Sequence, residues 1–245
     1  MPVCAICEQR VGQWLAHPHI AQRSEFMKLM QAVGSDLSVY QCPACGCTDR
    51  DRHLWLYMVA AGLPAQLQGA SVLHLAPERH LEPLIAACRP SRYVRGDLNP
   101  LRSDHQRLDV QALPFGDAEF DLVICNHVLE HVADPALALA EFQRCMRAGG
   151  LLIAQTPYAP VLRKTFELTT PQGPEFAKLF YGQEDHVRLF GSDITECFHA
   201  AGFVGELRTH DELLPGHDPL AYGCNASEPF FAFFKPQGAG QSQTI

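Results

Sequence analysis

The chain has 245 residues, of which 47% are hydrophobic and 19% charged, a balance typical of a folded globular protein that excludes wholesale disorder. Nineteen basic against 27 acidic residues give a formal charge of -8, which disfavours general binding of nucleic-acid phosphates but allows a local basic patch. The longest apolar stretch, residues 54–63, is about half of the roughly 20 residues that cross a bilayer, so no membrane span is expected.

Two Cys-x-x-Cys pairs open the chain, Cys4 with Cys7 and Cys42 with Cys45. Four thiolates complete the tetrahedral ligand set of a structural zinc ion, which folds a small module and performs no chemistry. The 34 residues between the pairs exceed the common spacing, so a redox pair with unrelated thiols is the alternative, and Cys47 offers a second register. No basic, apolar export signal precedes the ten cysteines, so we expect a cytoplasmic protein with reduced thiols.

The composition changes near Gly69. Before this residue a helix is predicted over 50–61, and after it short apolar runs alternate with segments of helical spacing. Repeated strand–helix–strand units give right-handed crossovers and a parallel sheet. We therefore predict a zinc-binding module with a linking helix over 1–68, followed by a Rossmann-like, doubly wound α/β domain over 69–236. Its predicted strands cover 71–75, 92–97, 106–109, 120–126 and 151–155, and its first helices cover 81–88 and 135–147.

The alternation stops at 156–191, a segment with four prolines that is too long for an idle connection and is predicted to be a lid or substrate wall. A helix capped by Ser192 or Asp193 is predicted to follow. Later strands over 203–207 and 229–235 would complete a mostly parallel sheet of seven strands, and the polar residues 237–245 predict a flexible tail.

Ligands of such sheets bind beyond the carboxyl ends of the strands. Asp97 ends the second predicted strand, where a carboxylate can accept both hydroxyls of an adenosine ribose. The alternative is a turn aspartate before Asn99 and Pro100. Asp109 follows the third strand, where its side chain and the backbone N–H of Val110 could recognise an adenine amino group and ring nitrogen.

The most specific segment is residues 120–135, FDLVICNHVLEHVADP. It resembles the class I S-adenosylmethionine-dependent methyltransferases, especially a branch with V-L-E-H-V-x-D-P after the fourth strand. The run D-V-x-x-L-P-F at 109–115 and Gly149-Gly150 before the fifth strand add to the resemblance. The N-terminal CPACGCTDRDRHLWLYM and the H-x-A-P-E at 74–78 are similar to zinc-ribbon-bearing members. Together these motifs extend from 4 to 235 in the order of the family.

The resemblance implies S-adenosylmethionine as cofactor beside structural zinc, and a methyltransferase activity. One departure concerns the first loop, where HLAPERH replaces the usual acidic-x-Gly-x-Gly-x-Gly. A loop without glycine must be held by Pro77 and side-chain contacts, and Glu78 becomes the candidate partner of the cofactor's ammonium group. A degenerate site that has lost the cofactor is the alternative. The candidate cofactor-binding residues are His74, Ala76, Glu78, Asp97, Leu98, Asp109, Val110 and Asn126.

Two histidines are the candidate catalytic residues. His127 follows the fourth strand, a position that commonly faces the transferred methyl group in the enzymes that the chain resembles. His186 lies in the polar run GQEDHVR at the end of the insertion, which could instead tie the lid to the domain. A neutral imidazole with a pKa of about 6.5 can take a proton from a hydroxyl or a protonated nitrogen, whereas a carbon nucleophile needs no such base.

Residues 127–131 also spell H-x-x-E-H, with two imidazoles predicted on one helical face. A metalloprotease site and an auxiliary metal on His127, Glu130 and His131 are therefore alternatives, although the motif starts at a strand end in a nucleotide-type fold. Otherwise Glu130 and His131 are expected to orient the loop.

The sequence thus predicts a methyltransferase for a small-molecule acceptor, with O- or N-methylation favoured. Aromatic residues in the insertion suit a partly aromatic or hydrophobic acceptor, but core packing explains them equally well. Methylation of ribosomal or transfer RNA is the first alternative, and net acidity without a continuous basic stripe makes nucleic acid an unlikely partner. The second alternative is a non-catalytic, zinc-containing scaffold for protein docking.

Overall fold

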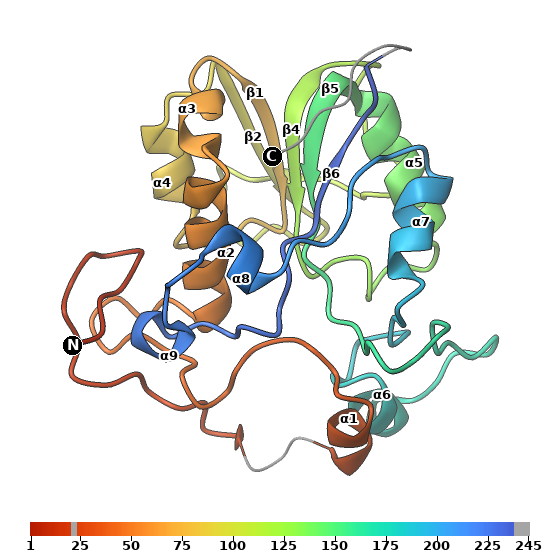
Figure 1. The fold of residues 1–245 in the computed structure, drawn as a ribbon. Helices are drawn as coiled ribbons and strands as arrows, with labels where there is room; N and C mark the ends of the chain where they lie inside the picture. The colour runs from red at the N-terminus through yellow and green to blue at the C-terminus, as the bar shows by residue number, and fades with distance from the viewer. Residues whose placement is uncertain (21–23, 238–245) are drawn as a thin grey trace.

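A computed structural model describes residues 1–20 and 24–237, so the predicted tail lies outside the described residues except for Gln237. The centre is a single sheet in the order β3-β2-β1-β4-β5-β6 (Figure 1). Its first five strands pair in parallel, and β6 is antiparallel to β5. The strands are β1 (Ser71–Leu75), β2 (Arg92–Asp97), β3 (Gln106–Arg107), β4 (Phe120–Cys125), β5 (Met146–Ile153) and β6 (Ala232–Phe234).

The described residues form six strands, so the prediction of seven was wrong. The segment predicted as a strand over 203–207 makes only isolated bridges, from Val204 to Phe234 and from Arg208 to Phe230. Gly205 lies between these bridges with a φ of +134°, a conformation that residues with a side chain rarely adopt. This backbone turn interrupts regular pairing at the outer edge of the sheet.

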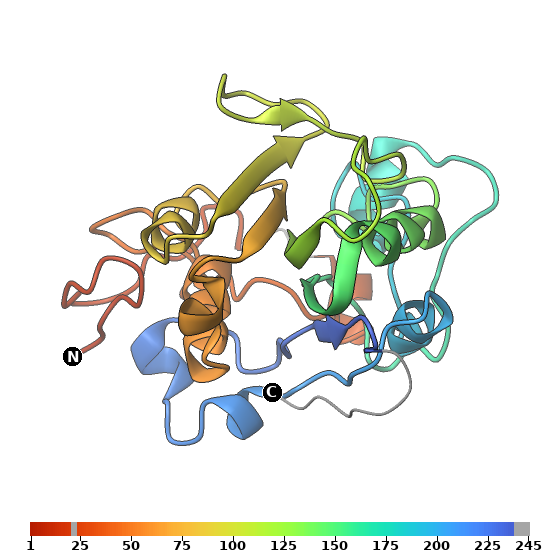
Figure 2. The same ribbon diagram turned by 90° about the horizontal axis from the view of Figure 1, so that it is seen from above.

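Helices cover both faces of the sheet (Figures 1 and 2). Successive side chains of a strand point to opposite faces, so Val72 packs toward α2 and α3 while Leu73 packs toward α5. Burial on both faces explains why these strands are continuous apolar runs. The helices of one face are α2 (Asp49–Ala60), α3 (Leu63–Leu67) and α4 (Glu82–Ala87); those of the other are α5 (Pro135–Cys145) and α7 (Ile194–Ala200).

Local signals fix the starts of the two longest helices. The side chain of Thr48 accepts from the backbone N–H of Asp51, and the Asp51 carboxylate accepts from the N–H of Thr48, so α2 begins with a capping box. Asp134 caps α5, and Pro135 occupies the first turn, where its missing N–H costs nothing. The prediction that this helix extends to residue 147 was wrong, because Met146 already pairs with Phe120 in the sheet.

The N-terminal segment packs against two distant parts of the chain. Helix α1 (Glu25–Leu29) lies on α6 (Pro174–Phe180) of the insertion, where the rings of Phe26 and Phe180 are 5.0 Å apart (Figure 1). The indole N–H of Trp14 donates to the carbonyl oxygen of Leu220 in the short helix α9 (Pro219–Tyr222), which follows the short helix α8 (His210–Leu213). Because α2 also shares a core with the sheet, the domain boundary at residue 68 stays a prediction.

Candidate active site

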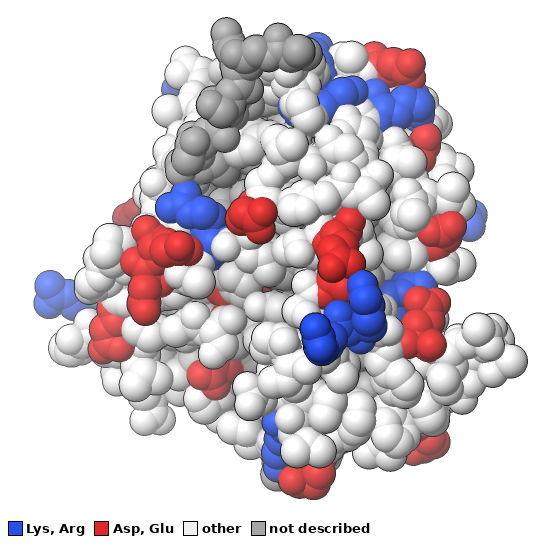
Figure 3. All heavy atoms as spheres, turned by 45° about the vertical axis from the view of Figure 1, so that its right-hand side comes forward, with Lys and Arg blue, Asp and Glu red and all other residues white. Residues whose placement is uncertain are grey.

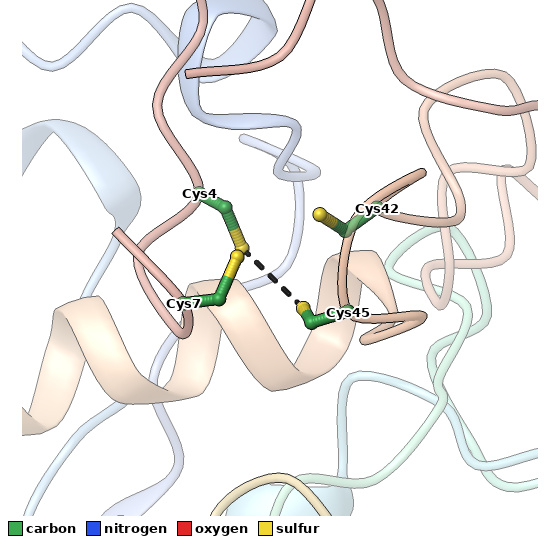
Figure 4. Close-up of side chains that lie close together, drawn as sticks. All are labelled: Cys4, Cys7, Cys42 and Cys45. Carbon is green, nitrogen blue, oxygen red and sulfur yellow. Dashed lines mark hydrogen bonds between the residues drawn. The ribbon is translucent and has the colours of Figure 1, made fainter. Parts of the chain in front are cut away.

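The two cysteine pairs come together at the N-terminal end of the molecule (Figure 4). The sulfur atoms of Cys4, Cys7, Cys42 and Cys45 all lie within 4.8 Å of one another. Each pair sits in a tight turn, closed by a hydrogen bond from the N–H of Glu8 to Cys4 and from that of Gly46 to Cys42. Zinc–sulfur bonds of about 2.3 Å need only a small contraction of this arrangement, so the donor set fits a structural zinc ion.

Cys47 lies immediately beside these four residues. It is fully buried, and its sulfur is 3.4 Å from that of Cys4. The hydrogen bond from Cys47 lowers the pKa of the Cys4 thiol to about 4, against the raising effect of burial. Burial raises the pKa of Cys7 to about 12. Cys47, the alternative zinc ligand that the sequence offers, is therefore close in space to the four cysteines of the two pairs.

A cavity of about 270 Å³ lies beyond the carboxyl ends of β1, β4 and β5. Ala76 and Glu78 follow β1, Asn126 and His127 follow β4, and Gln155 follows β5. The first turn of α2 forms another wall. The remaining lining residues are Thr48, Arg50, Asp51, Leu54, Arg79, His80 and Glu228.

Glu78 is the most elaborately held side chain of this cavity. Its carboxylate is 2.6 Å from Nε2 of His74 and accepts from Nδ2 of Asn126 at 2.8 Å. The other ring nitrogen of His74 is 2.9 Å from the hydroxyl of Tyr93. Burial acts to raise the pKa of Glu78, but the interactions with His74 and Asn126 outweigh it, so the pKa lies below its usual value. Glu78 therefore presents a negative charge to the cavity at neutral pH.

The backbone before Glu78 includes one left-handed residue although the loop contains no glycine. Ala76 has a φ of +47°, in the left-handed region, which costs a residue with a side chain about 1–2 kcal/mol. The resulting turn places both Ala76 and Glu78 on the cavity. The side chains of His74 and Asn126 supply the support that the sequence led us to expect.

The other four candidate cofactor residues lie along the same sheet edge but do not line this cavity. Asp97 accepts a hydrogen bond from the N–H of Asn99 at 2.7 Å. Asp109 accepts similarly from the N–H of Gln111 at 2.9 Å. Each aspartate therefore closes a turn, and the turn interpretation and the cofactor interpretation are compatible. Leu98 is exposed, and the side chain of Val110 packs in the core.

The H-x-x-E-H motif is not helical, so the prediction of two imidazoles on one helical face was wrong. Residues 127–133 form a turn that precedes Pro135, the first residue of α5. His127 itself has a φ of +54°. The turn instead lets His127 face the cavity while Glu130 points inward, with 3.6 Å between Nδ1 of His127 and the Glu130 carboxylate.

Glu130 is 1% exposed, and both its carboxylate oxygens are without a hydrogen-bond partner among the described residues. Burial raises its pKa to about 8. His186 from the insertion lies close by, its ring 4.7 Å from that of His131. Burial lowers the pKa of His186 to about 4 and that of His127 well below its usual value. Both imidazoles are therefore neutral at pH 7.

Arg188 holds the insertion against the turn. Its buried guanidinium donates to the carbonyl oxygens of Leu129, Val132 and Ala133 and pairs with Glu167. Arg188 thus ties the insertion to the domain, as the structural interpretation of the GQEDHVR run expects. His186, in the same run, lies instead beside His131 and Glu130.

A second cavity of about 430 Å³ adjoins the first. It lies between the N-terminal segment and the insertion, and Arg50 lines both cavities. None of its lining residues is acidic. Sequence reasoning missed Arg50, because the run TDRDRHLWL was assigned to the zinc module and nothing local shows which helix end meets the sheet. The lining residues include His17, His19, Tyr40, Pro157, Lys178, Tyr181 and His186.

Comparisons with known proteins agree with this architecture. Residues 68–154 match the family described as methyltransferase domain. The chain is 32% identical over 121 residues, 46% of its length and 42% of the relative's, to a protein named a probable S-adenosylmethionine-dependent methyltransferase from Mycolicibacterium smegmatis. It spans 14% to 42% of the length of the first curated relatives that it matches.

Two solved structures show the shared fold. An S-adenosylmethionine-dependent methyltransferase from Mesorhizobium loti has 14% identity and a TM-score of 0.51, covering 74% of this chain and 96% of its own. The [4+2]-cyclase SpnF has 13% identity and a TM-score of 0.52, and the match covers 92% of this chain and 100% of SpnF. The chain thus shares its fold with these two proteins, and since one of them is described as a cyclase, the fold by itself does not specify the reaction. None of the helices in the described part of the chain combines the length and hydropathy needed to cross a membrane.

Proposed function

We propose that the protein is an S-adenosylmethionine-dependent methyltransferase with a structural zinc ion on Cys4, Cys7, Cys42 and Cys45. The observation that carries the proposal is the charged carboxylate of Glu78, held by His74 and Asn126 at the carboxyl edge of the sheet. It lies within the segment that matches the methyltransferase domain.

The bound cofactor supplies a methyl group on a sulfonium, so the protein's main task is alignment of the attacking atom. Glu78 would bind the ammonium group, and the left-handed turn at Ala76, backed by His74, would leave room for the methionine part. Asp97 and Leu98 would contact the ribose. Asp109 and the N–H of Val110 would recognise the adenine. Asn126 acts on Glu78 and is a positioning residue.

The second cavity is the proposed acceptor site. Its volume of about 430 Å³ is within the usual range of small-molecule pockets, about 300–1,000 Å³. Arg50 connects it to the cofactor cavity, and its guanidinium makes no hydrogen bond or ion pair with the described residues. A free cation between the two cavities favours a small acceptor that carries a carboxylate or phosphate near the methylated atom. His127, neutral and on the cofactor cavity, is the proposed base for a hydroxyl or amine.

The alternatives have less support. Charges of both signs are interspersed on the face shown in Figure 3, without a continuous basic area for RNA. A docking scaffold would have no use for a charged carboxylate held inside a cavity, because an unused buried charge only costs free energy.

Calorimetric titration with S-adenosylhomocysteine tests the proposal. Wild type is expected to bind, and Glu78→Gln is expected to weaken binding about 10- to 100-fold, because a hydrogen bond to a charged group contributes about 1.5–3 kcal/mol. Asp97→Ala should also weaken binding. Glu196→Gln, on the exposed surface beside Lys164, is the matched control and should bind like wild type. The proposal would be contradicted if S-adenosylhomocysteine gave no heat of binding with wild type, or if Glu78→Gln bound it with the same affinity as wild type.

A further inference from the structure

Three side chains beside the two cavities carry four buried polar atoms that have no hydrogen-bond partner among the described residues. The buried atoms concerned are both carboxylate oxygens of Glu130, Nδ1 of His127 and Nε2 of His186. A buried polar atom without a hydrogen bond is costly, and native proteins keep few of them. Several together, all able to donate an electron pair, indicate that a ligand with positive charge is the missing partner.

His186 of this group and the neighbouring His131 are oriented as metal ligands are. Nδ1 of His186 is 2.8 Å from the carbonyl oxygen of Tyr181, and Nδ1 of His131 is 3.2 Å from that of Asp185. Each contact fixes the proton on Nδ1 and leaves Nε2 as a free electron-pair donor. Metal-binding histidines commonly have this arrangement, with the second nitrogen bonded to a carbonyl oxygen or carboxylate.

The donor atoms are close enough to share one ion. One atom each from Glu130, His131 and His186 lies within 4.8 Å of the others. Tetrahedral bonds of about 2.1 Å place neighbouring ligand atoms about 3.4 Å apart, so the side chains need to approach one another by up to about 1.4 Å. The side chain of His131 is 31% exposed, so its rotation can supply this movement.

We propose that Glu130, His131 and His186 bind one divalent transition-metal ion at the junction of the cofactor and acceptor cavities. Two imidazoles and one carboxylate are a ligand set that such ions prefer, and three protein ligands leave coordination positions open. His186 lines the acceptor cavity, so an acceptor oxygen can take one of these positions. That last step rests on the proposed function, whereas ion binding does not.

Two arginines near Glu130 oppose a cation, but neither neutralises the carboxylate. Arg188 donates its hydrogen bonds to carbonyl oxygens and to Glu167. Arg50 lines the cavities and makes no ion pair with the described residues. The carboxyl group of Glu130 is thus still available to an ion, which displaces the proton that burial keeps on it near neutral pH.

The test uses Mn²⁺ and Zn²⁺ on the full chain with its cysteine site loaded with zinc. Thiolates bind Mn²⁺ poorly, so electron paramagnetic resonance of bound Mn²⁺ reports the new site without interference from the cysteines. Metal analysis after dialysis against Zn²⁺ gives a second readout. Wild type is expected to hold one Mn²⁺, or one Zn²⁺ more than Glu130→Gln and His186→Ala. His199→Ala, on the outer surface of α7, is the control and should match wild type.

Melting temperatures distinguish loss of the metal ligand in Glu130→Gln from misfolding of this variant. Glu130→Gln keeps the shape of the side chain and removes a buried carboxyl group whose oxygens have no hydrogen-bond partner among the described residues, so its melting temperature without added metal should equal or exceed that of wild type. Added Mn²⁺ or Zn²⁺ should raise the melting temperature of wild type and leave that of Glu130→Gln unchanged.

The proposal is overturned if wild type holds no more of either ion than both variants do. Titration with S-adenosylhomocysteine in the same preparations separates the two proposals. Cofactor binding without the ion rejects the metal site alone, and ion binding without the cofactor product rejects the proposed function alone.

Discussion

Glu78, which lines the cavity, and Asp49, which is buried, differ in whether both carboxylate oxygens have partners. Glu78 has both oxygens engaged, by His74 and Asn126, and its pKa is lowered. Asp49 is fully buried with only one oxygen engaged, which accepts from the N–H of Asp36. Burial, followed by the negative charge of Glu228, raises the pKa of Asp49 to about 7. The same chemical group is therefore charged at one site and largely protonated at the other near pH 6.

Asp49→Asn should change how stability depends on pH. In wild type the folded state keeps a proton on Asp49 up to about pH 7, whereas the unfolded chain loses it near pH 4, so stability falls as pH rises through this interval. Asparagine keeps the hydrogen bond and has no proton to lose. The stability of Asp49→Asn relative to wild type, from urea unfolding, should rise by about 2–3 kcal/mol between pH 5 and pH 8.

The exposed Asp117, replaced by asparagine, is the control for this experiment and should show the same difference from wild type at both pH values. An equal difference for Asp49→Asn at pH 5 and pH 8 would show that Asp49 titrates normally.

At the scale of elements, the turn over 127–133 and the end of the insertion depend on each other. The N–H of Val187 donates to the carbonyl oxygen of Glu130, and Arg188 bonds three further carbonyl oxygens of the turn. Neither segment is a helix or a strand, so each owes its conformation to the other. This contact brings His186 to Glu130 and His131.

Arg188→Ala should lower the free energy of unfolding by about 3 kcal/mol, because it leaves the buried carbonyl oxygen of Leu129 and two part-buried carbonyl oxygens of the turn without their donor, and a buried group without a partner costs about 1–3 kcal/mol. Its other partner, Glu167, is 42% exposed and can be hydrated. Urea unfolding of the variant measures the effect. Arg163→Ala, on the surface of the same insertion, should change stability by less than about 0.5 kcal/mol. Equal stability of the two variants would mean that solvent replaces Arg188 in the turn.

For the whole molecule, the cysteine module and the sheet share the proposed cofactor site. Helix α2 starts at Asp49, two residues after Cys47, and its capping residue Thr48 and first-turn residues Arg50 and Asp51 line the cavity. Arg52 of this helix donates to the carbonyl oxygen of Cys47 in the cysteine module and to that of Gly223 in the C-terminal segment. It therefore links the helix to both parts of the chain. Folding of the module should therefore determine the shape of the cavity.

Cys42→Ser should lose the zinc ion and weaken S-adenosylhomocysteine binding at least about 10-fold, because metal binding provides the folding free energy of such a module. Cys47→Ala is the matched variant and should keep both the zinc ion and the affinity. Metal analysis and calorimetry on the same samples measure the two quantities. Zinc retained by Cys42→Ser but lost by Cys47→Ala would establish the other register, and full affinity without zinc would show that the cavity does not need the module.

The sequence by itself determined the local features of this protein. Apolar runs identified the parallel strands, and the sequence around Asp134 and Pro135 marked the start of α5 to the residue. The spacing of the cysteine pairs was enough to predict four sulfur atoms in one cluster. These features depend on neighbours in the chain, whose propensities and periodicity can be read directly.

Only the tertiary structure decided which distant segments meet. It ended the sheet at six strands, placed α1 on α6, and brought Arg50 between two cavities. It also replaced the expected helical H-x-x-E-H by a turn that meets His186 of the insertion. Such contacts join residues far apart in sequence, and the packing that selects them has no local pattern from which it could be predicted.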